Sequence, residues 1–400
     1  MEKWILDKLY QPVKDVMQRN GLKGLPGNWD WIYLLFFAII SMFFSCQENK
    51  TEQDSQLIEY SVDTVLIDSK DRILDLSGYM QRSDLDDDKR SLFLYNRHDH
   101  SIDEINLDRK AFVRSFPLEA EGPNGVGQYI FALQWVNDSL LFLKSIPFSS
   151  VIDKSGRVVQ KVNWLSAKDS LGEPFGAVPP RTELVVDIKD WRVVGTNLDF
   201  MKETAFLGVF SVLDNRVKNI DIDTKNSFSG YFLKAGTNFR PPWVYLTADE
   251  NHIYVTHEYS NEIILFNPAG ELVKVVDYEP KLTPKRPKLP EILNGTREQI
   301  GKEQRKLGEQ VSFEVPVWDK LNNRYFRLSK QWVYGEGDDE TAAYPRARVF
   351  LSVLDAEFSL VAEVELKDLF ASNYKYFAKD GKLWVCQNFS DELGFLVFDF

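Results

Sequence analysis

One pattern recurs along most of this chain: a turn that contains glycine, a short apolar run, a polar connection, and a second apolar run. Its clearest copy is the C-terminal stretch 378–400, where the Lys-Asp-Gly-Lys turn at 379–382 precedes the run 383–386 and the alternating run 395–400 ends the chain. Glycine-bearing turns between alternating runs are typical of antiparallel β-hairpins. The chain is therefore expected to fold from many short strands.

The predicted strands group into units of roughly 40 to 50 residues, which is the period of propeller blades. Similar glycine turns occur at Asp153–Arg157 and Asn267–Glu271. We count six units, with five and seven as alternatives. The alternating segment Ile58–Ile67 is expected to pair with the last unit, since closing the ring in this way removes exposed sheet edges. The predicted fold is all-β, a six-bladed β-propeller over residues 58–400.

The segment 284–310 interrupts the β pattern. Pro284–Pro290 contains three prolines and three basic residues, and Glu291–Gln310 has the narrow apolar stripe of an amphipathic helix. We expect a helical insertion between the fourth and fifth blades. The stripe either packs against the propeller or offers a surface to a partner.

Residues 31–44 form an uncharged apolar run that ends at Ser45-Cys46 and is followed by a polar stretch. The run is shorter than the roughly 20 residues that a membrane span requires, and it fits the apolar core of a signal peptide. A cysteine in this position resembles a bacterial lipoprotein signal, so residues 1–46 are expected to be a signal peptide that ends at an acylated Cys46. Residues 47–57 would then be a tether. The alternative is an uncleaved single-span anchor, and the basic residues before the run place the propeller outside the cytoplasm in both cases.

Composition excludes some classes of partner. The net charge is −12 and no Lys/Arg stripe is present, so a nucleic-acid partner is not expected. The two cysteines, Cys46 and Cys386, have no metal-type spacing and are not expected to form a disulfide. Neither a Gly-x-Ser-x-Gly elbow nor a His-Glu-x-x-His motif occurs, so the sequence predicts no cofactor, no metal and no named catalytic residue.

Candidate contacts for a ligand or partner are two histidines of the most regular unit and four tryptophans near predicted loops. They are His252, His257, Trp191, Trp243, Trp318 and Trp332. Burial between blades is the alternative for each of them. A candidate inter-blade loop contains Glu121, Gly122, Pro123, Asn124, Gly125 and Gly127. It lacks the spacing of a phosphate-binding loop, so it is interpreted as a compact turn whose glycines allow positive φ.

The leader, the chain length, the Glu121–Gly127 loop followed by Tyr129, and the repeated hairpins together resemble a family of six-bladed, propeller-like lipoproteins of unknown function from Gram-negative bacteria. The resemblance implies the fold and the compartment, and it supplies no catalytic residues. It implies an outer-membrane lipoprotein that faces the periplasm or the cell surface. The alternative location is the periplasmic side of the inner membrane, held by a single-span anchor.

The absence of a catalytic signature favours a binding scaffold whose inter-blade loops hold an envelope protein or a glycan. One alternative is an enzyme that processes a glycan or an ester with acidic residues around the propeller channel. Another is a sensor or regulatory partner of a membrane complex. The sequence makes no prediction of oligomeric state.

Overall fold

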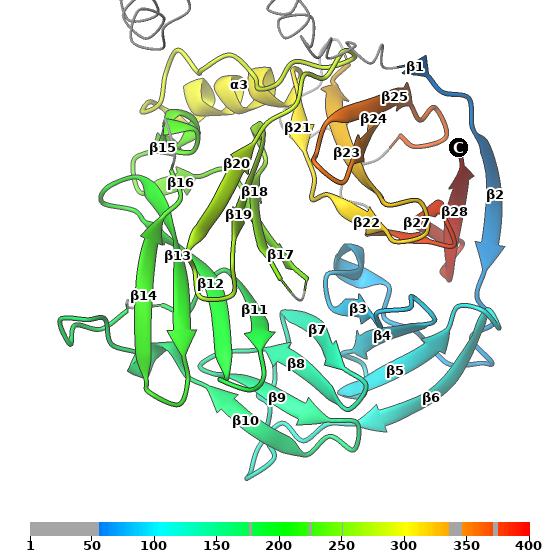
Figure 1. The fold of residues 1–400 in the computed structure, drawn as a ribbon, viewed down its shortest axis with the longest axis vertical. Coiled ribbons are helices and arrows are strands. Elements are labelled where there is room, and N and C mark those ends of the chain that lie inside the picture. The colour runs from blue at the N-terminus through cyan, green and yellow to red at the C-terminus, as the bar shows by residue number, and fades with distance from the viewer. Residues whose placement is uncertain (1–55, 176–177, 224–225, 250, 336–345, 371–374) are drawn as a thin grey trace, which may run out of the picture. The chain divides into compact units, whose positions relative to one another are not determined.

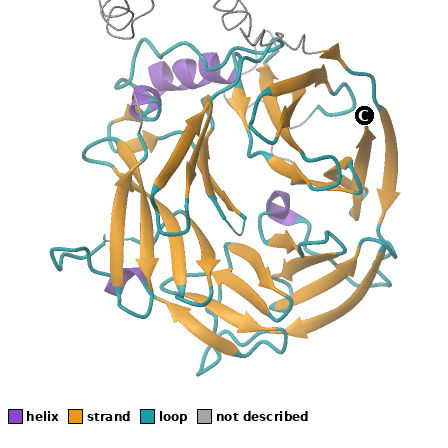
Figure 2. Ribbon diagram, viewed as in Figure 1, coloured by secondary structure: helices purple, strands orange, loops and turns teal. Residues whose placement is uncertain are grey.

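The computed structural model describes residues 56–175, 178–223, 226–249, 251–335, 346–370 and 375–400. The described part folds as six mainly antiparallel sheets around a central axis (Figure 1), with one further two-stranded hairpin, and strands dominate (Figure 2). The predicted all-β, six-bladed propeller is thereby confirmed. The apolar run 31–44 and Cys46 lie outside the described residues. Among the residues that are described, no helix has the length and apolar character needed to cross a membrane.

Blades 1 to 4 are four-stranded meanders. Their strands are β3 (Ser83–Leu85), β4 (Ser91–Asn96), β5 (Ser101–Asn106) and β6 (Ala111–Pro117) in blade 1; β7 (Ala132–Asn137), β8 (Leu140–Lys144), β9 (Ser149–Asp153) and β10 (Val158–Val162) in blade 2; β11 (Thr182–Asp187), β12 (Arg192–Asp199), β13 (Thr204–Ser211) and β14 (Arg216–Asp221) in blade 3; and β17 (Val244–Ala248), β18 (Ile253–His257), β19 (Ser260–Phe266) and β20 (Leu272–Val276) in blade 4. A small hairpin, β15 (Leu233–Ala235) with β16 (Asn238–Arg240), lies between blades 3 and 4.

Blades 5 and 6 use strands from both ends of the chain. Blade 5 contains β21 (Ser312–Phe313), β22 (Val317–Asp319), β23 (Arg324–Val333), β24 (Arg346–Asp355) and β25 (Leu360–Glu365), with β1 (Gln56–Leu57) added in parallel at its outer edge. Blade 6 contains β26 (Tyr376–Lys379), β27 (Lys382–Phe389), β28 (Glu392–Asp399) and the N-terminal strand β2 (Ser61–Leu66).

The ring is closed by β2, which pairs antiparallel with β28 from Ser61 opposite Asp399 to Leu66 opposite Gly394. This is the pairing that the alternating N-terminal segment predicts. Each pair of neighbouring blades, including blades 6 and 1, shares one cluster of buried apolar side chains. The core is therefore a circle of six inter-blade interfaces, and β2 contributes Val65 to the one that completes it.

The two faces of the ring differ in the length of their connections. The first strands of blades 1 to 4, which are β3, β7, β11 and β17, lie near the axis in Figure 1, and each contacts the next. On one face, each turn between strands has two to five residues, and Asp380-Gly381 has φ values of 54° and 77°, as a type I′ turn requires. On the other face, the six connections between blades have ten or more residues each. We call these the short-turn face and the long-connection face.

The helix α3 (Arg297–Gly308) lies in the connection from β20 to β21, where the insertion was expected. It begins at Thr296, whose side chain accepts a hydrogen bond from Gln299 N in a capping box, and so starts later than the predicted residue 291. The start is delayed because Leu293 O and Gly295 N hydrogen-bond to the backbone of Lys234 in β15, which holds residues 293–295 in an extended conformation. Ile300 and Leu307 are buried against the β15 region, so the apolar stripe packs locally.

Candidate functional site

Side chains from three consecutive blades gather at the inner edge of the long-connection face, where the first strands of blades 3, 4 and 5 begin. This group, called the mouth cluster below, contains Arg181, Trp243, Tyr245, Glu258, Glu314 and Lys330. It joins an aromatic surface to a set of charges, which is the combination that protein and glycan ligands use.

Trp243 is the exposed part of the mouth cluster. It directly precedes β17, and its side chain is half exposed. The Arg181 guanidinium carbon lies 4.4 Å from the centroid of the Trp243 ring system, a cation–π contact. The Trp243 backbone N–H donates to Glu258 Oε2 at 3.3 Å, which ties the tryptophan to the β18–β19 turn.

Two carboxylates and one ammonium group form the charged part. Lys330 Nζ donates to Glu314 Oε1 at 2.6 Å, and Lys330 is buried. Burial raises the pKa of Glu258 above its usual value, and the positive charge of Lys330 opposes that rise. Tyr245 lies close to the same two carboxylates. Burial raises its pKa well above 10, and the negative charges of Glu314 and Glu258 raise it further. The Glu258 carboxyl therefore binds its proton more tightly here than an exposed glutamate does in water.

Glu314 lies in a break in the first strand of blade 5, and Pro316 explains this break. Pro316 has no N–H to donate to a sheet, and the first strand of blade 5 is split there into β21 and β22. The Tyr376 hydroxyl satisfies two backbone groups at this break. It donates to the carbonyl of Val315 and accepts from Leu328 N at 3.2 Å. The strand break thus remains hydrogen-bonded while the Glu314 side chain reaches Lys330.

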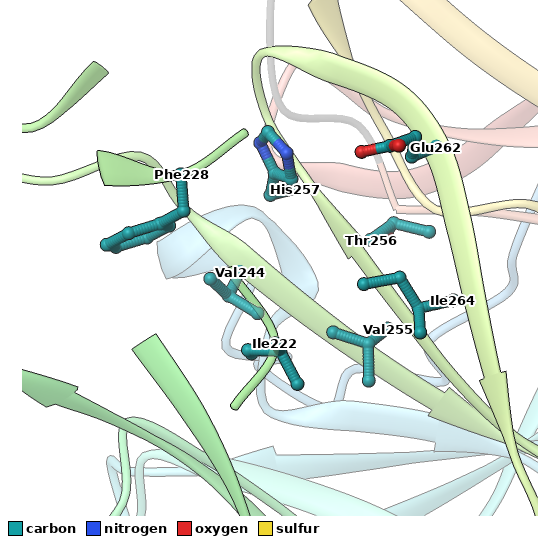
Figure 3. A pocket seen from close by; sticks show the side chains of 8 residues that line it. All are labelled: Ile222, Phe228, Val244, Val255, Thr256, His257, Glu262 and Ile264. Carbon is teal, nitrogen blue, oxygen red and sulfur yellow. The ribbon is translucent and has the colours of Figure 1, made fainter. Parts of the chain in front are cut away.

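His257 is the last residue of β18 in blade 4 and lines a small cavity (Figure 3). The cavity has room for about 10 Å³, close to the minimum for one water molecule. The Glu262 carboxylate points toward the His257 ring in Figure 3, and neither ring nitrogen nor Glu262 Oε2 has a hydrogen-bond partner among the residues that the structure describes. Burial lowers the pKa of His257 to about 3, with Arg327 and Arg286 adding to the effect, so the ring is neutral. His257 therefore lines a small, mainly apolar cavity inside the protein and is not part of a contact surface.

A larger hollow opens on the long-connection face, between the segments 226–231 and 286–293. Its volume is about 760 Å³. One side carries the η4 turn (Ser229–Tyr231) and the other the proline-rich start of the insertion. The Tyr231 hydroxyl donates to the carbonyl of Pro287 at 2.6 Å and fixes the two segments together. We call this hollow the loop cleft.

Comparison with known proteins supports this architecture. Residues 54–365 match a family described as a domain of unknown function, DUF4221. The chain belongs to the DUF4221 family. The crystal structure of a DUF4221 member from Bacteroides vulgatus superposes with a TM-score of 0.62 at 14% identity, covering 87% of this chain and 99% of that one. A putative exported protein from Bacteroides fragilis has a TM-score of 0.49 at 8% identity, with 85% and 95% covered. No curated protein matches the chain.

In this DUF4221 chain the predicted contact residues divide between the two faces. Trp243 and Trp332 are on the long-connection side, with Trp332 packed against the last turn of α3, where a Cβ on Gly308 would lie 2.6 Å from the Trp332 ring. The short-turn side holds the other three candidates that are not deeply buried: His252, Trp191 and Trp318. The six candidates therefore do not form one site.

The predicted inter-blade loop is a compact turn on the long-connection face. Gly122 and Gly127 both have φ of 89°. Val126 between them is fully buried, and a Cβ on Gly127 would lie 2.4 Å from Ser145 Oγ. The loop therefore packs blade 1 on blade 2, and Glu121, Pro123 and Asn124 are its outer residues.

Sequence reasoning missed most of the mouth cluster. Glu258, Glu314 and Lys330 come from three places in the chain and share no spacing. The Phe-Glu-Val-Pro segment at 313–316 was a usable signal, since a proline beside a predicted strand marks an irregular sheet edge. In the described residues, no group of three or more His, Cys, Asp or Glu side chains is arranged to hold a metal.

Proposed function

We propose that this protein is an extracytoplasmic, membrane-tethered β-propeller that binds an envelope protein or glycan on its long-connection face. The mouth cluster carries the proposal. A half-exposed tryptophan with a guanidinium stacked on it, beside a carboxylate, is the kind of group that dominates binding energy in protein interfaces and stacks on sugar rings.

The asymmetry of the two faces supports this choice. Short turns leave little adaptable surface on one side, whereas long connections between rigid blades are where binding residues concentrate in scaffold folds. The mouth cluster and the loop cleft both belong to the long-connection face.

The binding test uses the soluble propeller, residues 56–400, on a glycan array and as bait for detergent-extracted envelope proteins. We expect a saturable partner whose binding is weakened by Trp243→Ala. Trp318→Ala is the matched control, because that tryptophan is partly exposed on the short-turn side. If wild-type protein captures neither a glycan nor an envelope protein, the proposed function is wrong.

The tether is tested separately. Mass spectrometry of the mature N-terminus is expected to find a triacylated Cys46, and Cys46→Ala is expected to release the protein from the outer membrane. An intact residue 1 in the membrane fraction would support the single-span inner-membrane anchor instead.

Hydrolysis of a glycan or an ester is a second candidate, favoured by one observation: the raised pKa of Glu258 beside the Glu314–Lys330 pair suits a general acid. A thiol nucleophile is not favoured, since burial raises the pKa of Cys386 to about 12. Chromogenic glycosides and esters test this candidate. Turnover that Glu258→Gln abolishes would support it, and no turnover of any substrate would count against it.

A further inference from the structure

The loop cleft is large and carries positive charge on a strongly acidic protein. Its volume of about 760 Å³ is within the range of roughly 300–1,000 Å³ for small-molecule sites. Arg286 and Lys288 both line it and both are exposed. The whole chain has a net charge of −12, so two cations in one hollow are a local exception.

These two cations have no ion-pair partner in the described residues, unlike their neighbour. Lys285, one position earlier, pairs with Asp277 at 3.5 Å and also with Glu279. The nearby Asp223 carboxylate is occupied by backbone donors, accepting from Phe228 N at 2.7 Å and Ser229 N at 3.1 Å. The charges of Arg286 and Lys288 are therefore available to a ligand.

The other wall of the cleft, the segment 226–231, supplies two serines. Ser227 is 3% exposed, lines the cleft, and its Oγ has no hydrogen-bond partner in the described part of the protein. A buried hydroxyl without a partner costs free energy unless something bonds to it. Ser229 also lines the hollow, and the exposed Leu289 and partly exposed Leu293 give it an apolar wall.

We propose that the loop cleft binds a phosphate or sulfate ester carried by a larger organic group. The tetrahedral oxyanion accepts hydrogen bonds from Arg286, Lys288 and the Ser227 hydroxyl, and the leucine wall contacts the organic part. Guanidinium and ammonium groups form short, charge-assisted hydrogen bonds to such oxyanions. The cleft is several times larger than a bare anion, so the ester binds more tightly than the free anion. This site is separate from the mouth cluster and does not depend on the function proposed for it.

Calorimetry on the soluble propeller tests the proposal with glucose 6-phosphate, glucose 6-sulfate, inorganic phosphate, inorganic sulfate and glucose. We expect binding of one or both esters, weaker binding of the free anions and none of glucose. Arg286→Gln and Lys288→Gln should each weaken ester binding about tenfold or more, because each removes a charge-assisted hydrogen bond. The control Lys285→Gln removes the same charge from the same segment and should change affinity less than twofold.

Ser227→Ala provides a readout that a structural role would not give. It should weaken ester binding about threefold or more while leaving the unliganded protein as stable as wild type, since the hydroxyl has no partner to lose. The proposal is overturned if no ester binds at millimolar concentration, if free anions bind as tightly as esters, or if Lys285→Gln weakens binding as much as Arg286→Gln. Trp243→Ala should leave ester binding unchanged, so failure here and failure at the mouth cluster are distinguishable.

Discussion

Val65 of the N-terminal strand β2 pairs directly with Phe395 of the last strand β28, although 330 residues separate them. Both side chains are buried in the cluster that joins blades 6 and 1. The ring is therefore held closed by a sheet pairing and an apolar interface together, and β2 covers the edge of β28 that would otherwise be the outer edge of blade 6.

This closure predicts unequal losses of stability for the same substitution at two adjacent residues of β2. Val65→Asp places an unpaired charge between blades and removes apolar burial, so the free energy of unfolding should fall by about 3 kcal/mol or more. Thr64→Asp adds the same charge to the same strand, but Thr64 is exposed on the other side, so the change should stay within about 0.5 kcal/mol. Urea denaturation measures both. Equal effects would mean that β2 does not hold this register.

The Tyr376 hydroxyl supports the split first strand of blade 5. Tyr376→Phe leaves Val315 O and Leu328 N without their partner, so unfolding free energy should fall by about 1–3 kcal/mol. The exposed Tyr129 provides a control, since Tyr129→Phe removes a hydroxyl from the surface. Thermal denaturation compares the two variants. Unchanged stability in Tyr376→Phe would indicate that water satisfies the strand break.

The buried His257 predicts a dependence of stability on pH. Its folded pKa of about 3 is below the ordinary value of 6.5, mainly because of burial, so below pH 6.5 the unfolded chain binds a proton that the folded chain does not. The contribution of this residue should be constant above pH 6.5 and should become destabilising as pH falls from 6.5 toward 3, by up to about 1.4 kcal/mol per pH unit.

His257→Leu removes the titrating group, so its unfolding free energy should fall less than that of wild type between pH 7 and pH 5. Urea denaturation at both pH values measures the difference. His252→Leu is the control, because His252 lies at a partly exposed turn. Parallel pH profiles for wild type and His257→Leu would contradict the burial of a neutral imidazole.

The pattern of neighbouring residues along the chain was sufficient to predict the propeller fold, but it did not predict the mouth cluster. The alternation in Ile58–Ile67 and the glycine turns at 156, 270 and 381 specify strands and hairpins, and these follow from neighbouring residues alone. The strand β3 was missed because its only apolar side chain, Leu85, lies in an acidic run that looks like a solvated loop. The mouth cluster was missed because Glu258 and Glu314 meet only when two blades are packed together, a long-range relationship that no spacing along the chain encodes.

The long-connection face is proposed to bind a partner through the mouth cluster. The most direct test of this proposal compares the affinity of wild type, Trp243→Ala and Trp318→Ala for the tightest ligand from the array or envelope capture, after circular dichroism shows that all three are folded. We predict that Trp243→Ala weakens binding by at least roughly tenfold, as loss of a tryptophan hot spot does, while Trp318→Ala binds like wild type. Equal affinity of Trp243→Ala and wild type, or an equal loss in both variants, would contradict the account.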